Sequence, residues 1–128
     1  MAVLKVIMIG DVVGDPGLEV LEKRLPALRA EYGALLVTVN GENAAGGFGL
    51  SGESLDRIFA AGADVVTSGN HVWEKREFWP ILESGNPVLR PANYPDQPLR
   101  HNATSPLFSG AAEPVKNPGT VSDEAAAA

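Results

Sequence analysis

The segment "ADVVTSGNH" (residues 63–71) joins an apolar run to a polar ending. Its first part, "ADVVT", is apolar and β-branched, which is typical of a buried strand. Gly69, Asn70 and His71 follow directly, although residues of these types contribute almost nothing to a hydrophobic core. The strand therefore delivers polar side chains to its carboxyl end, and the rest of the chain can be interpreted from this order.

Apolar strand segments and helical segments alternate from residue 1 to about residue 95. Strands are predicted at residues 3–9, 34–39, 63–68 and 86–90, and helices from Asp15 onward, around 53–61 and around 74–83. In the first helix we expect Asp15 as the N-cap, Pro16 at the first position, a kink or break near Pro26, and Gly33 at the end. The pattern predicts an α/β fold with flanking helices and a mostly parallel sheet that is covered on both faces.

Composition limits the classes of protein to which the chain can belong. It has 128 residues, no cysteine and a net charge of −6, which excludes disulfides and thiolate metal sites and argues against strong nucleic-acid binding. The beginning of the chain lacks a signal-peptide cleavage site and no apolar run could span a bilayer, so we expect a cytoplasmic protein without membrane contact. An anionic substrate would need a local source of positive charge, such as a bound metal.

The last part of the chain has a different composition. Six of the ten prolines lie after residue 90, and apolar residues there show no sustained period. We therefore divide the chain into a domain at residues 1–95 and an irregular tail at residues 96–128. Within the tail, residues 101–128 are expected to be poorly ordered.

Three predicted strands end in the same order of residues. The first ends in "IGD" (9–11), the second in "NGEN" (40–43) and the third in "SGNH" (68–71). The carboxyl ends of parallel strands lie at one edge of a sheet, where open α/β folds bind ligands. The polar side chains of these endings are therefore expected to converge: Asp11, Glu42, Asn43, Asn70 and His71.

Oxygen and imidazole donors of this kind suit manganese, iron, zinc or magnesium. A carboxylate such as Glu42 could bridge the ions of a two-metal phosphoesterase. Each residue also has a structural explanation, since Asp11 can cap a turn, Glu42 and Asn43 can be solvated loop residues, and Asn70 can cap a helix beside a surface histidine. Other sites are disfavoured, because the chain has no Walker motif, no dinucleotide fingerprint and no nucleophile elbow.

Four motifs of the chain resemble successive motifs of the small bacterial calcineurin-like metallophosphoesterases. They are "IGDVVGDPG", "NGENAAGGFGLS", "TSGNHVWEKRE" and "PVLRPANYP". The resemblance is to the branch described as cyclic-nucleotide phosphodiesterases and covers residues 1 to about 95. It implies half of a metallophosphoesterase sandwich and hydrolysis of 2',3'-cyclic nucleotides or related phosphodiesters. The implied cofactors are two divalent metal ions, which would be iron, manganese or zinc rather than magnesium.

The resemblance also implies a role for each of the five residues. Asp11 and Asn43 would bind one metal ion, Asn70 would bind the second, and Glu42 would bridge both. His71 would be the catalytic general acid that protonates the leaving oxygen.

The chain departs from this family in its second half. Family members are considerably longer and carry further histidine ligands there, whereas this chain has only His71 and His101. We expect His101 to be a solvated tail residue, so that the metal site is half built and an apolar face stays uncovered. A fragment, a frameshift product and a divergent gene would each fit this pattern.

Functions of different classes therefore stay open. In the first, the chain is a phosphoesterase that acts on a phosphate-ester or cyclic-nucleotide small molecule once the missing half is supplied. In the second, it is a catalytically inactive α/β fragment that serves as a binding module or forms a homo-oligomer through its uncovered apolar face. A flavodoxin-like binding domain without metal is a third interpretation.

Overall fold

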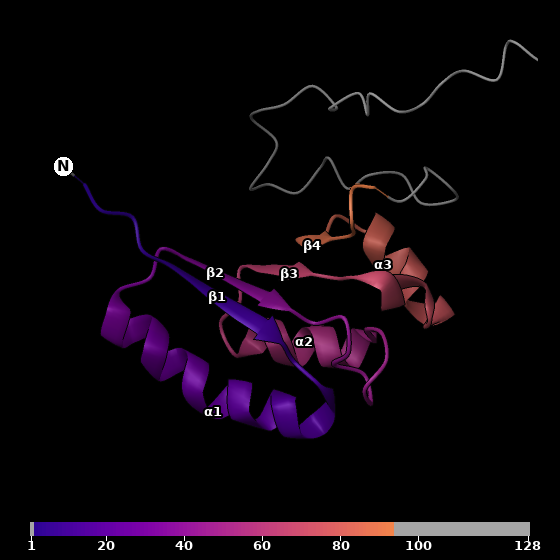
Figure 1. The fold of residues 1–128 in the computed structure, drawn as a ribbon, viewed down its shortest axis with the longest axis horizontal. Coiled ribbons are helices and arrows are strands. Elements are labelled where there is room, and N and C mark those ends of the chain that lie inside the picture. Colours follow the sequence, from indigo (N-terminus) through magenta and orange to yellow (C-terminus); the bar gives the residue numbers. More distant parts are fainter. Residues whose placement is uncertain (1, 94–128) are drawn as a thin grey trace, which may run out of the picture.

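The computed structural model describes residues 2–93, which form a four-stranded sheet with helices packed against it (Figure 1). The strands are β1 (Val6–Asp11), β2 (Leu36–Asn40), β3 (Val65–Thr67) and β4 (Val88–Leu89). They lie in the order β1-β2-β3-β4, and each neighbouring pair is parallel. The predicted α/β class and parallel sheet are confirmed, whereas the predictions for residues 96–128, including His101, lie outside the described residues.

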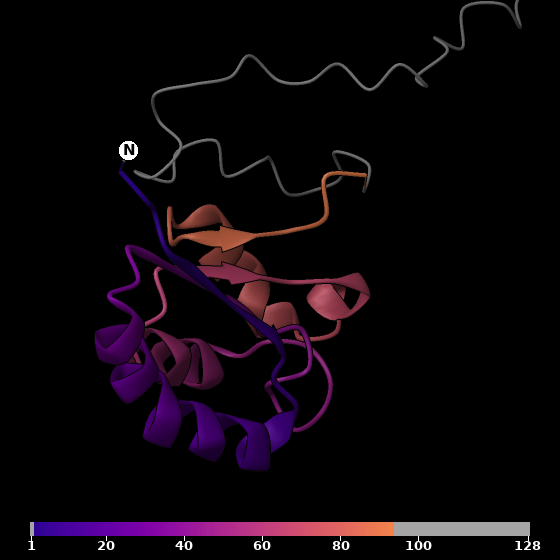
Figure 2. The same cartoon turned by 60° about the vertical axis from the view of Figure 1, so that its left-hand side comes forward.

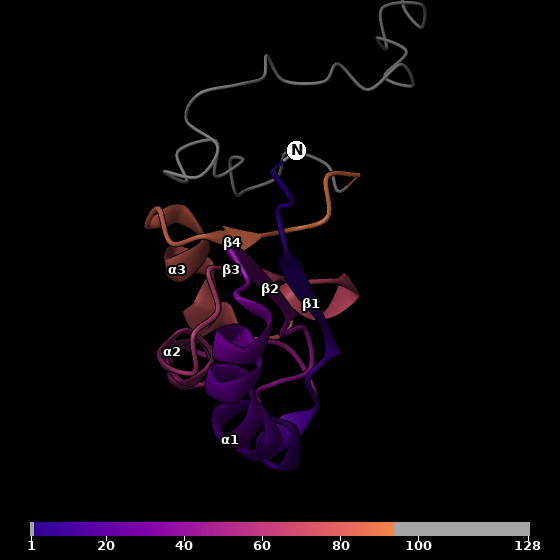
Figure 3. The same cartoon turned by 90° about the vertical axis from the view of Figure 1, so that its left-hand side faces the viewer.

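The helices pack against one face of the sheet (Figure 2 and Figure 3). They are α1 (Gly14–Tyr32), α2 (Gly52–Ala60) and α3 (Trp79–Glu83). The 3-10 turns η1 (Asn70–Trp73) and η2 (Arg76–Phe78) follow β3 and lead into α3. The order of the strands follows the order of the chain, so successive right-handed crossovers return on the same side. The flanking helices are confirmed, but the prediction that both faces of the sheet are covered is wrong at β1, where Val6 and Met8 are exposed, because alternation of elements does not reveal the order of the strands.

The hydrophobic core lies between the sheet and the helices. Alternate strand residues point into it, and the parallel register aligns them in rows: Ile7, Ile9, Val37, Val39, Val66 and Val88. Full burial of an aliphatic side chain of this size contributes about 1.5–3 kcal/mol. The same alternation points Val6 and Met8 to the opposite face, where they are 50% and 80% exposed. β1 therefore leaves part of an apolar sheet face uncovered.

Helix α1 differs from the prediction where it begins. It starts at Gly14 without a side-chain N-cap, and the Gly14 N–H group donates to the carbonyl of Asn43 at 3.0 Å. This contact satisfies a free N–H group of the first turn, so Asp15 is not the N-cap. The helix is not broken at Pro26 and ends, as predicted, at Gly33 with a φ of 59°. With 19 residues it is the longest helix described, yet no helix of residues 2–93 has the length and apolar character needed to cross a membrane.

The helix predicted at residues 74–83 is replaced by the turn η2 and the short helix α3. Pro80 lies in the first turn of α3, where its missing N–H group costs no hydrogen bond. A helix that began at residue 74 would hold Pro80 in its interior, where the ring clashes with the preceding turn. Phe78 and Leu82 are nevertheless buried in the core.

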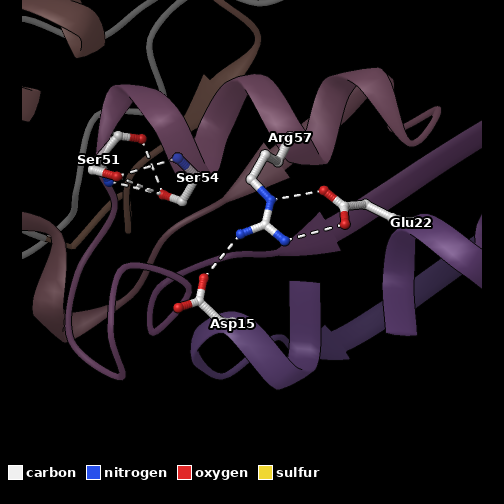
Figure 4. A network of polar contacts seen from close by, with 5 residues as sticks. All are labelled: Asp15, Glu22, Ser51, Ser54 and Arg57. Carbon is white, nitrogen blue, oxygen red and sulfur yellow. Dashed lines mark hydrogen bonds and ion pairs between the residues drawn. The ribbon is translucent and has the colours of Figure 1, made fainter. Parts of the chain in front are cut away.

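A network of ion pairs joins α1 to α2 (Figure 4). Arg57 donates to the carboxylate of Glu22 at 2.7 and 3.1 Å and to Asp15 at 2.9 Å. The hydrogen bond from Arg57, aided by its charge, holds the pKa of Glu22 below the usual value of a glutamate. At the start of α2, Ser51 and Ser54 form a capping box in which each side chain accepts from the other's backbone N–H group. Asp15 therefore joins two helices instead of capping one.

Candidate functional site

The carboxyl ends of the strands form one edge of the sheet, and the predicted site residues follow them. The register places Asp11, Asn40 and Thr67 side by side in one row. Backbone bonds continue the row, since Val12 donates to the Asn40 carbonyl and Gly41 to the Thr67 carbonyl, both at 3.0 Å. The loops that follow β1, β2 and β3 therefore leave the sheet next to one another, as predicted.

Asp11 and Asn43 are in direct contact although they belong to different loops. The Nδ2 atom of Asn43 donates to Oδ2 of Asp11 at 2.8 Å. The backbone carbonyl of Asn43 accepts from the N–H groups of Gly14 and Gly47, at 3.0 and 3.1 Å. These bonds fix the position of Asn43. With Nδ2 directed at Asp11, the Oδ1 atom of Asn43 and the carboxylate of Asp11 are the oxygen donors that the pair can offer to an ion.

The carboxylate of Glu42 lies against the backbone of Gly69 at the end of β3. A Cβ atom on Gly69 would overlap this carboxylate, so only glycine leaves room for it. The Oε2 atom of Glu42 is buried and has no hydrogen-bond partner within residues 2–93. A buried anionic oxygen is costly unless a donor or a cation compensates it. The position of Glu42 therefore fits a metal ligand, because a cation at Oε2 would supply the missing compensation.

Asn70 and His71 begin the turn η1 immediately after Gly69. Asn70 is exposed, whereas the imidazole of His71 contacts two neighbours. Its Nδ1 atom lies 3.4 Å from Oε1 of Glu74, one turn further along the chain. Its ring packs edge-to-face against Phe48, with the ring centroids 5.4 Å apart and the planes at 78°. The imidazole is thus held from both its nitrogen and its ring.

The sequence pattern does not identify Glu74 or Phe48 as site residues. The spacing of three residues between His71 and Glu74 becomes a signal only when a helical turn is known to connect them. Phe48 reaches His71 because the glycine-rich loop after β2 folds onto the turn η1. Gly49 has a φ of +73°, and a Cβ atom there would come within 3.2 Å of the His71 carbonyl oxygen.

The described residues offer a limited set of metal ligands. Within residues 2–93, no three His, Cys, Asp or Glu side chains are arranged to hold an ion by themselves. A metal site built from the predicted residues would therefore need the amide oxygens of Asn43 and Asn70 in addition to the carboxylates of Asp11 and Glu42.

Comparisons with known proteins identify relatives of the chain. Residues 7–104 match the model of a family described as YmdB-like protein. A 2',3'-cyclic-nucleotide 2'-phosphodiesterase of Bacillus subtilis is 38% identical over 93 residues, which are 73% of this chain and 35% of that protein. A putative phosphatase/phosphodiesterase of Mycoplasma genitalium is 33% identical over 90 residues, which are 70% of this chain and 32% of that protein.

Solved structures share the fold as well. A hypothetical protein from Thermus thermophilus aligns with a TM-score of 0.67 and 47% identity over 72% of this chain and 35% of that chain. A structure described as a novel phosphatase of Mycoplasma pneumoniae aligns with a TM-score of 0.70 and 33% identity over 74% of this chain and 34% of that chain. The matched segment thus spans about a third of the length of these relatives.

Proposed function

The chain belongs to the YmdB-like family, a family of calcineurin-like phosphoesterases, and from this we propose that it supplies half of a metal-dependent phosphodiesterase site. The proposed substrate class is a 2',3'-cyclic nucleotide or a related phosphodiester, because the Bacillus subtilis relative bears that name. The observation that carries the proposal is the buried, unpartnered Oε2 atom of Glu42 beside Gly69. An anionic oxygen in this state needs a cation, and a cation at this edge would attract a phosphate.

Four residues are the proposed metal ligands. Asp11 and Asn43 would hold one ion, which their direct contact supports, while Asn70 would hold a second ion and Glu42 would bridge both. These donors suit iron, manganese or zinc. Divalent cations bound there would neutralise charge on the phosphate oxygens and favour the ionisation of water near neutral pH.

His71 is the proposed proton donor. Its Nδ1 atom faces Glu74, so Nε2 is the ring nitrogen that can face a substrate. As the oxygen of a water-derived hydroxide bonds to phosphorus and the bond to the leaving oxygen breaks, the Nε2–H group of the imidazolium gives its proton to the leaving oxygen, and a neutral imidazole remains. An alkoxide leaving group such as a ribose oxygen needs this proton, whereas a nitrophenolate does not.

The proposed site needs further donors before it can act. Zinc, iron and manganese sites use about four or more ligands for each ion, and four side chains here cannot satisfy two ions. The resemblance to calcineurin-like enzymes implies that the remaining donors are histidines outside the matched segment. We therefore expect turnover only when residues equivalent to the rest of the longer relatives are present.

Metal content and hydrolysis test the proposal together. The chain is purified with manganese, alone and co-expressed with the unmatched part of the Thermus thermophilus relative, and bound metal is measured by mass spectrometry alongside hydrolysis of 2',3'-cyclic AMP. The co-expressed protein should bind metal and hydrolyse the substrate, and Glu42→Ala should lose both. Glu53→Ala, an exposed acid on α2, is the matched control. Full metal binding and turnover in Glu42→Ala would show that the proposal is wrong.

A second candidate function is a catalytically inactive module that associates with its own copies. The exposed apolar residues of β1 and of the segment before it favour this second function, since Val3 and Leu4 are 78% and 72% exposed and Met8 is 80% exposed. Sedimentation of the chain alone distinguishes the two functions. A dimer that Met8→Glu dissociates, in a protein that binds no metal with or without its complement, would favour the second.

A further inference from the structure

Two residues without an assigned role contact the proposed proton donor. We propose that Glu74 and Phe48 are positioning residues for His71, with Glu74 holding the proton on Nδ1 and Phe48 restricting rotation of the ring. The proposal rests on the proposed function for what His71 does, but its geometric content can be tested without any activity. It goes beyond metal binding, because neither residue is needed as a ligand.

The contact with Glu74 selects one protonation pattern of the imidazole. Nδ1 lies 3.4 Å from Oε1 of Glu74, and an ionised carboxylate can only accept a hydrogen bond. The contact is therefore favourable only when Nδ1 carries a proton. In the neutral ring this leaves Nε2 as the unprotonated nitrogen, and in the imidazolium it makes Nε2–H the proton that can be transferred. A carboxylate on the other ring nitrogen orients catalytic histidines in hydrolases in the same way.

The backbone keeps Glu74 beside His71. The N–H group of Glu74 donates to the carbonyl of His71 at 3.2 Å, so both side chains leave the same turn. The glycine-rich loop packs against this turn, since a Cβ atom on Gly49 would come within 3.3 Å of the Glu74 Cβ atom and 3.1 Å of the Lys75 Cγ atom. His71 and Glu74 are 26% and 55% exposed in their side chains, so the pair is open to solvent and is not part of the core.

Phe48 approaches the imidazole from the loop after β2. It is 61% exposed, so hydrophobic burial does not explain its position, whereas its edge-to-face contact with His71 does. Three glycines surround Phe48 in the sequence: Gly46, Gly47 and Gly49. Their φ values are 67°, 96° and 73°, which residues other than glycine rarely adopt. The glycines thus fix the path of the loop, and the loop holds Phe48 against the ring.

The tautomer of His71 is the direct readout. It is measured by long-range ¹⁵N–¹H correlation in the full chain, at a pH where the imidazole is neutral and without metal or substrate. A His101→Gln background leaves His71 as the only histidine. The variants are Glu74→Ala, Glu74→Gln and, as the matched control, Glu77→Ala, an exposed acid on the neighbouring turn η2.

The Nδ1–H form should predominate in the parent and in Glu77→Ala. Glu74→Ala should lower the ratio of the Nδ1–H form to the Nε2–H form roughly two- to fivefold, as expected for the loss of a partly exposed charged contact. Glu74→Gln keeps an acceptor oxygen without the charge and should retain part of the preference. An unchanged ratio in Glu74→Ala would overturn the assignment of Glu74. Phe48→Leu should remove the ring-current shift of the His71 ring protons, and an unchanged shift would overturn the assignment of Phe48.

Turnover of the co-expressed protein separates this inference from the proposed function. A tautomer change in Glu74→Ala, in a protein that shows no phosphodiesterase activity in any form, would leave the positioning intact and remove the proposed function. Phosphodiesterase activity in the co-expressed protein, together with an unchanged tautomer in Glu74→Ala, would support the proposed function and remove the positioning role of Glu74. If the proposed function and the positioning role are both correct, Glu74→Ala should lower kcat for a substrate with an alkoxide leaving group more than for one with a nitrophenolate, with little change in KM.

Discussion

Replacement of Gly69 by alanine tests whether the position of the Glu42 carboxylate makes the metal site. An added Cβ atom would overlap that carboxylate, which is the end of a flexible side chain. The φ of Gly69 is −146°, so the variant does not need a left-handed backbone, and the overlap with Glu42 is the contact that it tests. We expect Glu42 to rotate away from β3 while the fold stays intact.

The magnitude of this effect should depend on the metal. Without metal, rotation brings the buried Oε2 atom of Glu42 into water, which offsets the overlap, so the free energy of unfolding should change by less than about 1 kcal/mol. With metal, displacement of an oriented ligand should weaken binding about 10- to 100-fold. The change in metal affinity should therefore exceed any change in the stability of the metal-free protein.

Calorimetric titration with manganese and urea unfolding measure the two quantities in the co-expressed protein. Gly10→Ala is the matched control, because it lies at the end of β1 beside Asp11 and its Cβ atom would meet nothing within 4 Å. If Gly69→Ala bound manganese with an affinity within twofold of the parent, the position of the Glu42 carboxylate would not depend on Gly69. A large loss of metal-free stability that the additional change Glu42→Ala does not relieve would also refute the reasoning, since Gly69 would then serve the backbone and not the carboxylate.

Three further changes test the ion pairs, the open sheet face and the proton donor. Arg57→Gln should destabilise the folded protein near neutral pH. Because Arg57 lowers the pKa of Glu22, the ion pair stabilises the fold fully at pH values above the pKa that Glu22 has in the unfolded chain. This stabilisation is lost as the pH falls through the lower pKa that Glu22 has in the folded protein. Urea midpoints of variant and parent should converge in acid, and a constant difference would contradict this. Met8→Glu, at a side chain 80% exposed, should change the free energy of unfolding by less than about 0.5 kcal/mol while abolishing any self-association seen by sedimentation; association that persists would exclude this face. His71→Ala in the co-expressed protein should keep the metal and slow release of an alkoxide roughly 10²–10⁴-fold, with a smaller loss for nitrophenolate; loss of metal in step with activity would make His71 a ligand.

Part of the candidate site can be predicted because it depends on local order along the chain. Strands that alternate with helices are parallel, and parallel strands end at one edge of the sheet. Asp11 and Asn43 follow two adjacent strands, so this order predicts that they lie near each other, and their hydrogen bond at 2.8 Å agrees with that prediction. The glycine between β3 and Asn70 is also explained, because Glu42 occupies the space where a side chain at Gly69 would lie.

The features that the sequence does not predict depend on contacts between distant segments. Asp15 has the right residue type and position for an N-cap, but the carbonyl of Asn43 already accepts the N–H group of Gly14. The position of Phe48 follows from loop glycines with positive φ, whose combined effect on the path of the loop is not a local property. The order of the strands is equally invisible in the alternation of elements, whereas the uncovered face is expected from the resemblance to longer enzymes.

The hydrophobic core is complete within the described residues, whereas the proposed site needs groups from outside them. The core between the sheet and the helices is closed within residues 2–93, since Val37, Val39 and Val66 are fully buried. The proposed site is not closed in this way, because Glu42 keeps a buried oxygen without a partner and β1 keeps Met8 exposed on the opposite face. Docking of one further segment could compensate the Glu42 oxygen, by bringing further metal ligands, and also cover the exposed face of β1. A lack of turnover in the chain alone would therefore be expected of a phosphoesterase half, and only the behaviour of the completed site distinguishes it from an inactive module.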